Sequence, residues 1–306
     1  MKPYILVIGS SNTDMVVKAP HLPAPGETIL GGTFFMNAGG KGANQAVAAA
    51  RLGADVVFIA KIGDDIFGKQ SVKLFEQEGI NTDYIVLDPV NPSGVALITV
   101  DDNAENCIVV ASGANAALNP DHLHRAGQTI INAPLILMQL EIPIETIEYV
   151  ANIAAENKVK VILNPAPACK LSDALLSKVT IITPNKTEAE MLTGIKITDK
   201  ESTELAAKVL ADKGIETVII TLGDKGALVY ADNKYQWLPA PVVKAVDTTA
   251  AGDIFNGALA VAISEGKNIK DAATFACSAA ALSVTKMGAQ SSAPYRHEIE
   301  INQRHS

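Results

Sequence analysis

The sequence predicts an α/β fold in which a mostly parallel, doubly wound sheet is flanked by helices and carries a small β flap. Six short runs are apolar at nearly every position, as is typical of strands buried on both faces. They span residues 4–8, 56–59, 135–140, 159–163, 180–183 and 217–221. Helical patterns alternate with them at 41–52, 67–78, 144–157, 172–176 and 202–213. Such alternation indicates βαβ units, and therefore a parallel sheet covered by helices on both faces.

Length and composition are those of a globular chain. Its 306 residues allow one large domain or two smaller ones, and we expect a single domain over residues 1–306. The 25 Lys and Arg against 33 Asp and Glu give a net charge of −8, which disfavours binding to nucleic acid or to an anionic membrane. Cys107, Cys169 and Cys277 form no CxxC pair, and no apolar run is as long as a membrane span or a signal-peptide core. We therefore expect a cytoplasmic protein.

Two segments interrupt the alternation and are predicted to form the flap. Residues 13–38 contain several Pro and Gly and then a strand-like run at 28–35, and residues 93–111 form a hairpin around Asp101-Asp-Asn103. Long inserted strands need partners, so we expect the two segments to pair as a lid over the carboxyl ends of the main strands. Two separate surface hairpins are the alternative. A further hairpin, at 227–238, is expected at the edge of the sheet.

Polar residues follow the predicted strands, and ligands of open α/β sheets bind outside these carboxyl ends. The polar segments are 9–12, 139–141, 164–167, 183–185 and 221–223. Nearby, the glycine-rich segment 38–45 opens a helix, where backbone and ligand are able to approach closely. This segment matches neither a P-loop nor a dinucleotide fingerprint. The alternative is a simple turn that leaves Lys41 in solvent.

A second helix start, at residues 246–253, combines a carboxylate with free backbone amides. The sequence Val-Asp-Thr-Thr-Ala-Ala-Gly-Asp precedes an apolar helix, so the amides of Ala251, Gly252 and Asp253 form a potential anion site. A carboxylate beside a bound anion suits phosphoryl transfer, in which an Asp accepts a hydroxyl proton. The alternative is an acidic residue that only interacts favourably with the helix dipole.

Two shorter motifs have both a structural and a functional interpretation. Asn185 and Glu188 have the spacing of a capping box, or else form a polar pair near a magnesium triphosphate. The segment 221–226, Thr-Leu-Gly-Asp-Lys-Gly, either lies under a nucleotide or enters a hairpin. The five histidines form no HExxH motif and no Ser/His/Asp set, which disfavours a metalloprotease or a serine hydrolase.

Five motifs, taken in order, resemble the ribokinase (PfkB-type carbohydrate kinase) family. They are Asn-Thr-Asp at 12–14, Gly-Gly-Lys-Gly-Ala-Asn at 39–44, Asn-Lys-Thr-Glu at 185–188, the segment 221–226, and Asp-Thr-Thr-Ala-Ala-Gly-Asp at 247–253. The resemblance extends from about residue 4 to residue 294. It implies a ribokinase-like fold and ATP-dependent phosphorylation of D-ribose at the 5-hydroxyl, which yields D-ribose 5-phosphate and ADP. Related kinases of deoxyribose, fructose or adenosine are alternatives, as is a sugar- or nucleotide-binding regulator without catalysis.

The resemblance also implies roles for individual residues. Asp253 would be the base, and the amides of Ala250, Ala251, Gly252 and Asp253 would form the anion hole. The implied sugar-binding set is Asn12, Asp14, Gly40, Lys41, Asn44, Glu141 and Asp253. The implied ATP set, with Mg²⁺ near its first two members, is Asn185, Glu188, Thr221, Gly223, Asp224, Lys225, Gly226, Gly252 and Cys277. A monovalent cation, K⁺, would be held mostly by carbonyls of Asp247, Thr249, Ser283, Lys286, Gly288 and Ser292. The resemblance further implies a homodimer formed through the lid strands.

Two physical arguments bear on these implications. The flap segments hold several acidic residues, only Lys18 as a cation, and no Arg that would clamp a second phosphate, which disfavours a sugar-phosphate substrate. A nucleoside substrate would need aromatic faces, and Phe34 and Phe35 are the aromatic residues of the flap. Ala250 stands where the wider family usually has Gly. Because alanine resists positive φ, we expect Ala250 in an ordinary backbone region.

Overall fold

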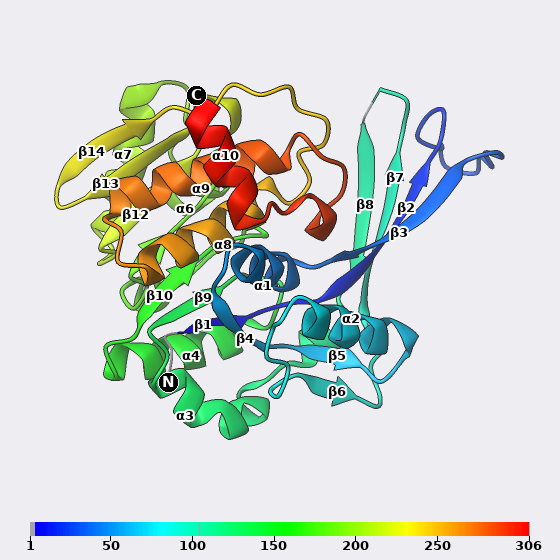
Figure 1. The fold of residues 1–306 in the computed structure, drawn as a ribbon, viewed down its shortest axis with the longest axis horizontal. Coiled ribbons are helices and arrows are strands. Elements are labelled where there is room, and N and C mark those ends of the chain that lie inside the picture. Colours follow the sequence, from blue (N-terminus) through cyan, green and yellow to red (C-terminus); the bar gives the residue numbers. More distant parts are fainter. Residues whose placement is uncertain (1–3, 104, 306) are drawn as a thin grey trace.

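An eight-stranded sheet forms the centre of the molecule, in the order β14-β13-β12-β11-β10-β9-β1-β4 (Figure 1). The computed structural model describes residues 4–103 and 105–305, so Ala104 of the predicted flap hairpin lies outside them. Six strands are parallel: β1 (Tyr4–Ile8), β4 (Asp55–Ile59), β9 (Leu135–Met138), β10 (Lys160–Leu163), β11 (Ile181–Ile182) and β12 (Thr217–Thr221). The antiparallel hairpin of β13 (Ala227–Ala231) and β14 (Lys234–Leu238) forms one edge, where a hairpin was expected.

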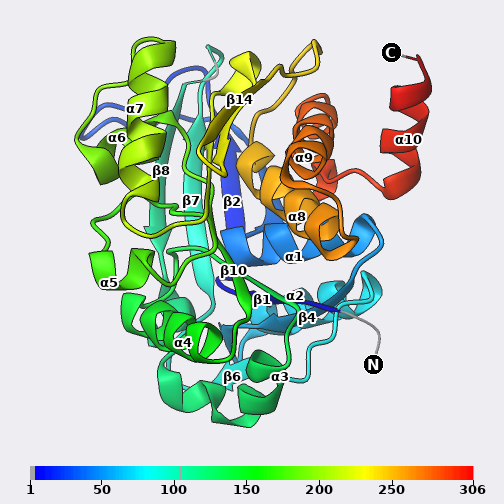
Figure 2. The ribbon, with the colours of Figure 1, turned by 90° about the vertical axis from the view of Figure 1, so that its left-hand side faces the viewer.

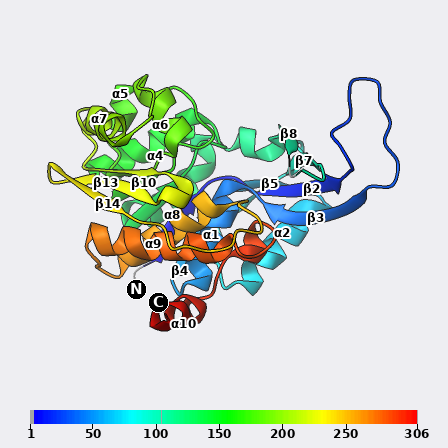
Figure 3. The same cartoon turned by 90° about the horizontal axis from the view of Figure 1, so that it is seen from above.

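Helices cover both faces of this sheet (Figures 2 and 3). One face packs against α1 (Lys41–Arg51), α2 (Ile66–Gln77), α8 (Ala251–Ser264) and α9 (Ile269–Ser283). The other face packs against α3 (Gly127–Ile131), α4 (Ile144–Glu156), α5 (Asp173–Leu176), α6 (Lys186–Thr193) and α7 (Lys200–Ala211). The last helix, α10 (Arg296–His305), packs beside α9. Among the residues that the structure describes, no helix is long and apolar enough to cross a membrane.

The central strands are apolar throughout because each contributes to two cores. Along β1, Ile5 and Val7 point to the core shared with α1 and α8, whereas Leu6 and Ile8 point to the core shared with α4. All four side chains are at most 1% exposed. A strand buried on both faces gains nothing from alternation, which is why its sequence reads as one apolar run. The predicted α/β fold is therefore confirmed.

A separate four-stranded sheet projects from one end of the main sheet (Figures 1 and 3). Its order is β3-β2-β7-β8, with β2 (Asn12–Lys18), β3 (Thr33–Gly39), β7 (Gly94–Val100) and β8 (Asn106–Ala111). The strand β2 pairs with β3 in antiparallel fashion and with β7 in parallel, so the two inserted segments share one sheet. A short parallel pair, β5 (Lys61–Gly63) and β6 (Val86–Asp88), forms a third sheet.

Some predicted boundaries are wrong. The strand-like run at 28–35 is irregular up to residue 32, and β3 begins only at Thr33. Gly31 has φ = 90°, a conformation that breaks an extended strand. Conversely, β2 begins at Asn12 and ends at Lys18, just before the Pro- and Gly-containing part of the predicted flap segment. The helices α9 and α10 were not predicted, although Lys270, Thr274 and Ser278 recur every four residues on the polar face of α9.

Candidate active site

A polar cavity lies between the start of α8 and the carboxyl ends of β10, β11 and β12. Its volume is about 190 Å³. The polar residues that line it are Lys41, Asn164, Thr183, Asn185, Glu188, Thr221, Thr248, Asp253 and Asn256. Ala250, Ala251 and Gly252 complete the wall on the side of α8. The cavity therefore occupies the position at which an open α/β sheet binds its ligand.

Ala250 caps α8 in the left-handed region, with φ = 59° and ψ = 11°. The expectation of an ordinary backbone region for this residue is wrong. The left-handed conformation costs an L-residue about 1–2 kcal/mol, so the surrounding loop must hold Ala250 in place. No side chain caps α8, and the first amides of a helix have no partner within it. The N–H of Ala251 donates to the Thr248 carbonyl at 3.3 Å, which leaves the amides of Gly252 and Asp253 as the freer donors.

The Asp253 carboxylate is buried and held by two amides of helix α1. Its exposed fraction is 5%. Asn44 Nδ2 donates to Oδ2 at 2.9 Å, and Gln45 Nε2 donates to Oδ1 at 3.0 Å. Burial raises the pKa of Asp253, whereas the Lys41 ammonium and the two amide donors act to lower it. Asp253 in turn raises the pKa of Lys41. A carboxylate that faces the cavity with a raised pKa is a plausible proton acceptor by geometry and by chemistry.

Two further carboxylates lie near Asp253 on the side of the four-stranded sheet. Glu141 Oε2 accepts from Ser10 Oγ at 2.5 Å and from the Lys41 backbone N–H at 3.0 Å. Asp14 belongs to β2, and its pKa is raised to about 6 by burial first, then by Glu141 and by Asp253. Asp253 and Glu141 each accept two hydrogen bonds from the protein, whereas Asp14 has no donor among the described residues, so the three carboxylates together keep acceptor sites open. They are suited to a ligand that offers several hydroxyl groups.

Glycines bring the backbone close enough to build this region. Gly40 has φ = 89°, and a Cβ there would lie 2.7 Å from the backbone nitrogen of Asn12. A Cβ on Gly39 would lie 2.3 Å from Asp14 Oδ2. The turn into α1 therefore tolerates no side chain, and the predicted close approach of backbone has a structural reason. The predicted sugar-binding residues Asn12, Asp14, Gly40, Lys41, Asn44 and Glu141 come from these neighbouring turns and strands.

Asn185 and Glu188 form the capping box of α6 and also line the cavity. The Asn185 N–H donates to Glu188 Oε2 at 2.8 Å, and the Glu188 N–H donates to Asn185 Oδ1 at 2.9 Å. Burial raises the pKa of Glu188. The structural interpretation of this motif is therefore correct. It does not exclude the functional one, because both side chains face the cavity.

A larger, mostly apolar cavity of about 560 Å³ adjoins the first and shares Thr221, Thr248, Ala251 and Gly252 with it. Of the predicted ATP set, Thr221, Gly223, Asp224, Gly226, Gly252 and Cys277 line this second cavity. Lys225 lies in the same turn, the 3₁₀ helix Gly223–Lys225, but is not among the lining residues. Burial raises the pKa of the Cys277 thiol to about 11, so this cysteine is a neutral packing residue there.

The predicted cation residues come from the segment that precedes α8, from the end of α9 and from the segment that follows α9. Asp247 Oδ1 accepts from the Thr249 N–H at 2.9 Å, and Oδ2 accepts from the Gly288 N–H at 2.8 Å. Ser283 and Ser292 are buried. The Lys286 ammonium donates to Glu298 at 2.6 Å, so its charge is engaged elsewhere. In the part of the chain that the structure describes, no cluster of three or more His, Cys, Asp or Glu side chains is arranged for a metal ion.

Sequence reasoning missed several polar residues around the site. Gln45 donates to the Asp253 carboxylate, and the Asn256 side chain donates to the Gly252 carbonyl at 2.8 Å. Asn164 and Thr183 line the cavity. Asn164 and Thr183 fall in the polar segments at the strand ends, which is the signal that located them as a group. Nothing in the sequence distinguishes Gln45 from other polar positions of an amphipathic helix.

Another missed residue, Asn115, orients Asn12. Asn115 Nδ2 donates to Asn12 Oδ1 at 2.8 Å, and Asn115 Oδ1 accepts from the Ser11 N–H at 2.9 Å. This arrangement leaves Nδ2 of Asn12 as the group available to a ligand. Asn115 belongs to the 3₁₀ helix Gly113–Ala117, at the junction between the main sheet and the four-stranded sheet.

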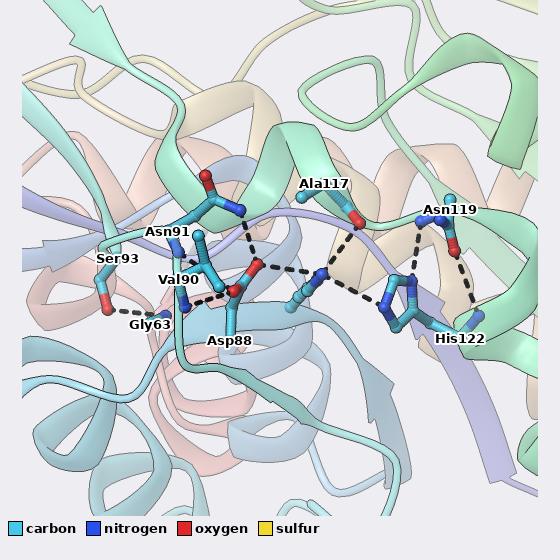
Figure 4. A network of polar contacts seen from close by, with 9 residues as sticks. Gly63, Asp88, Val90, Asn91, Ser93, Ala117, Asn119 and His122 are labelled. Atoms are coloured by element: carbon cyan, nitrogen blue, oxygen red, sulfur yellow. Dashed lines mark hydrogen bonds and ion pairs between the residues drawn. The ribbon is translucent and has the colours of Figure 1, made fainter.

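A buried cluster anchors the same 3₁₀ helix (Figure 4). The Lys61 ammonium pairs with Asp88 at 3.0 Å, donates to the Ala117 carbonyl at 3.2 Å and lies 3.2 Å from His122 Nε2. The N–H groups of Val90 and Asn91 and the Asn91 amide donate to Asp88, and together with Lys61 they hold its pKa below the usual range. Because both members of the ion pair have further partners, the charges are compensated within the fold.

Comparisons with known proteins agree with this arrangement. Residues 2–296 match the family model described as pfkB family carbohydrate kinase. The chain is 50% identical to a ribokinase of Haemophilus influenzae over 298 residues, which cover 97% of each protein. It is 40% identical to a deoxyribokinase of Salmonella typhi over 291 residues, 95% of each protein. The structure of Arabidopsis thaliana ribokinase complexed with ribose and ATP aligns with a TM-score of 0.93 and 33% identity, covering 98% of both chains.

Proposed function

The chain belongs to the pfkB family of carbohydrate kinases, and from this premise we propose that it transfers the γ-phosphoryl group of ATP to the 5-hydroxyl of D-ribose. The products are D-ribose 5-phosphate and ADP. One observation carries the proposal: the buried Asp253 carboxylate faces the same cavity as the uncapped amides at the start of α8. A proton acceptor and donors for a transferring phosphoryl group thus stand at one point.

Asp253 acts as the base in this proposal. It accepts the proton of the 5-hydroxyl as the oxygen attacks phosphorus, and the bond from phosphorus to the leaving ADP oxygen breaks. The amides of Gly252 and Asp253, with the dipole of α8, stabilise the charge on the transferring oxygens. Lys41, which lines the cavity, adds a positive charge on the same side. Groups that are fixed by the fold in this way need little reorganisation in the transition state.

The sugar site is built for hydroxyl groups. Carboxylates from Asp14 and Glu141 accept hydrogen bonds, while the amides of Asn12 and Asn44 both donate and accept. Asn44 Oδ1 is buried without a partner among the described residues, so a sugar hydroxyl supplies the donor that it needs. The site offers no Arg for a second phosphate, which supports a free sugar over a sugar phosphate.

ATP extends from the polar cavity into the adjoining apolar one. The triphosphate lies near Asn185 and Glu188, and the adenine lies in the cavity lined by Gly226, Phe255 and Cys277. Gly252 lies where the two cavities meet, and a Cβ there would contact nothing within 4 Å. That free space is consistent with close approach of a phosphate to the backbone.

The residues fit the metal ions that this reaction uses. Mg²⁺ binds proteins through few carboxylates and keeps waters and phosphate oxygens as ligands, so Glu188 and Asn185 would hold it together with the phosphates of ATP. When bound, the ion neutralises charge on the phosphates. For K⁺, Asp247 ties the segment before α8 to the segment at Gly288, because its carboxylate accepts from the N–H groups of Thr249 and Gly288. We propose that K⁺ stabilises the strained turn at Ala250. Phosphorylation rates measured in KCl and in NaCl at equal ionic strength test this role. Equal rates in the two salts would remove the ion from the mechanism.

The four-stranded sheet is proposed to act as the lid over the sugar. It carries Asn12 and Asp14 on β2, and closing it would exclude water as a competing acceptor. Its outer strands β3 and β8 have free edges, with Phe34, Met36 and Val109 largely exposed. These features support a homodimer formed through the lid strands, and sedimentation of the purified protein tests the dimer.

Deoxyribose is the second candidate substrate, because one relative is a deoxyribokinase at 40% identity. The decisive experiment is an ADP-release assay with ribose, deoxyribose, fructose, adenosine and fructose 6-phosphate as acceptors. The expected result is the highest kcat/KM with ribose, because a site with paired donors and acceptors discriminates against a missing hydroxyl. A higher kcat/KM with another acceptor would transfer the assignment to that substrate.

A further inference from the structure

Helices α1 and α8 approach each other so closely that a side chain of α1 reaches the base. At Gly257, an added Cβ would lie 2.7 Å from Ala48 Cβ and 2.8 Å from the Gln45 carbonyl oxygen. Asp253 lies one helical turn before Gly257 and therefore on the same face of α8. The close crossing thus places Gln45 directly against the Asp253 carboxylate.

The Gln45 side chain accepts one hydrogen bond through its oxygen and donates two through its nitrogen. Gln139 Nε2 donates to Gln45 Oε1 at 2.6 Å. Gln45 Nε2 then donates to Asp253 Oδ1 at 3.0 Å and to Asn164 Oδ1 at 3.1 Å. The two protons of the Gln45 amide are both used, and its oxygen is taken by Gln139. A flipped Gln45 amide would place its oxygen against two acceptors, so Gln139 fixes which group of Gln45 faces the base.

This arrangement carries a cost that the fold alone does not explain. Gln45 and Gln139 are fully buried, and Gln139 Oε1 has no partner among the described residues. An unsatisfied buried acceptor costs about 1–3 kcal/mol, and an apolar residue of similar size would avoid that cost. A costly polar pair that ends on the reacting carboxylate indicates a role in the reaction.

We propose that Gln45 and Gln139 are positioning residues that hold the Asp253 carboxylate toward the sugar hydroxyl. This inference rests on the proposed function. Helix α1 presents Asn44 and Gln45 to the two carboxylate oxygens, so the plane of the carboxylate is fixed from both sides. Because the donors are neutral amides, they restrain the carboxylate without neutralising it, and it stays able to accept a proton.

Substitution of Gln45 by Met tests the proposal, since Met fills the space without donating. Loss of one hydrogen bond to a charged group predicts a decrease in kcat of roughly tenfold to a hundredfold. The KM values for ribose and ATP are expected to stay within about twofold. Gln139→Met should also lower kcat, but by a smaller factor than Gln45→Met. It removes the restraint on the Gln45 amide and leaves that amide in place. Gln236→Met, on the distant strand β14, is the matched control and should leave kcat unchanged.

A second measurement does not depend on turnover. The pKa of Asp253 is followed by carbon NMR of the labelled carboxyl group, assigned by its absence in Asp253→Asn. Removal of the Gln45 donor is expected to raise this pKa by roughly one unit in the resting protein. The variants keep the other charged groups that face Asp253, which are Lys41, Glu141, Asp14 and Glu188.

The outcomes separate the two proposals. Activity on another acceptor, with the shift in the Asp253 pKa intact, would overturn the substrate and leave the positioning role standing. An unchanged pKa together with an unchanged kcat in Gln45→Met would overturn the positioning role. A change in KM alone, or equal losses in Gln45→Met and Gln236→Met, would also overturn it by indicating a structural effect. If Gln45→Met does not fold, Gln139→Met provides the same readouts.

Discussion

Replacing Ala250 by Gly should stabilise the protein although it removes a methyl group. The left-handed conformation of Ala250, with φ = 59°, costs an alanine about 1–2 kcal/mol and a glycine almost nothing. Glycine instead adds about 0.5–1 kcal/mol of unfolded-state entropy that folding must remove. The difference is a net gain of about 0.5–1 kcal/mol in the free energy of unfolding. For a domain of this size, the corresponding rise in Tm is roughly 2 °C.

Urea denaturation followed by tryptophan fluorescence measures this gain, with Lys158→Gly as a matched control. Lys158 also has a positive φ of 58°, but it lies between α4 and the amino end of β10, whereas the cavity lies at the carboxyl end of that strand. Both variants should gain stability by a similar amount, and Ala250→Gly should retain its turnover because the amides of α8 keep their places. If Lys158→Gly is stabilised while Ala250→Gly is destabilised, the strain argument at the anion site fails.

Three other substitutions test the chemistry. Asp253→Asn should lower kcat by roughly 10²–10⁴-fold while calorimetry still detects ATP and ribose binding, and near-normal turnover would contradict the role of base. Gly252→Ala should fold normally, because its Cβ meets no protein atom, yet raise the KM for ATP by filling the phosphate position; unchanged ATP kinetics would place the phosphate elsewhere. Asp14 has a pKa of about 6, so ribose affinity should fall as the pH drops below 6, and Asp14→Asn should abolish this dependence. That pKa lies above the unfolded value of 3.8, so the native state binds an extra proton between about pH 4 and 6. The contribution of Asp14 to the free energy of unfolding therefore decreases as the pH rises through this window. Urea denaturation with the same pH dependence in wild type and Asp14→Asn would refute this contribution.

The sequence was most informative where one physical demand dominates. Strands buried on both faces must be apolar throughout, so β1 and β12 were predicted with their observed ends. The amides at the start of α8 and the carboxylate of Asp253 were visible because glycine, aspartate and an apolar helix follow one another in the chain.

Contacts between distant segments were not predictable in this way. The conformation of Ala250 is imposed by the loop around it, against the preference of alanine. Gln45 and Asp253 are 208 residues apart, and their hydrogen bond exists because Gly257 lets two helices cross closely. The ends of β3 depended on the conformation of Gly31, which composition alone does not determine.

The crossing of α1 and α8 has a consequence for how such an enzyme is able to change. In the proposed mechanism, helix α1 presents both a sugar contact and the amide that holds the proton acceptor, and α8 carries the acceptor itself. The four-stranded sheet would supply the sugar contacts Asn12 and Asp14 and close over the site. Exchanging the sheet between related proteins is thus a route to new acceptor sugars that leaves the reaction step intact.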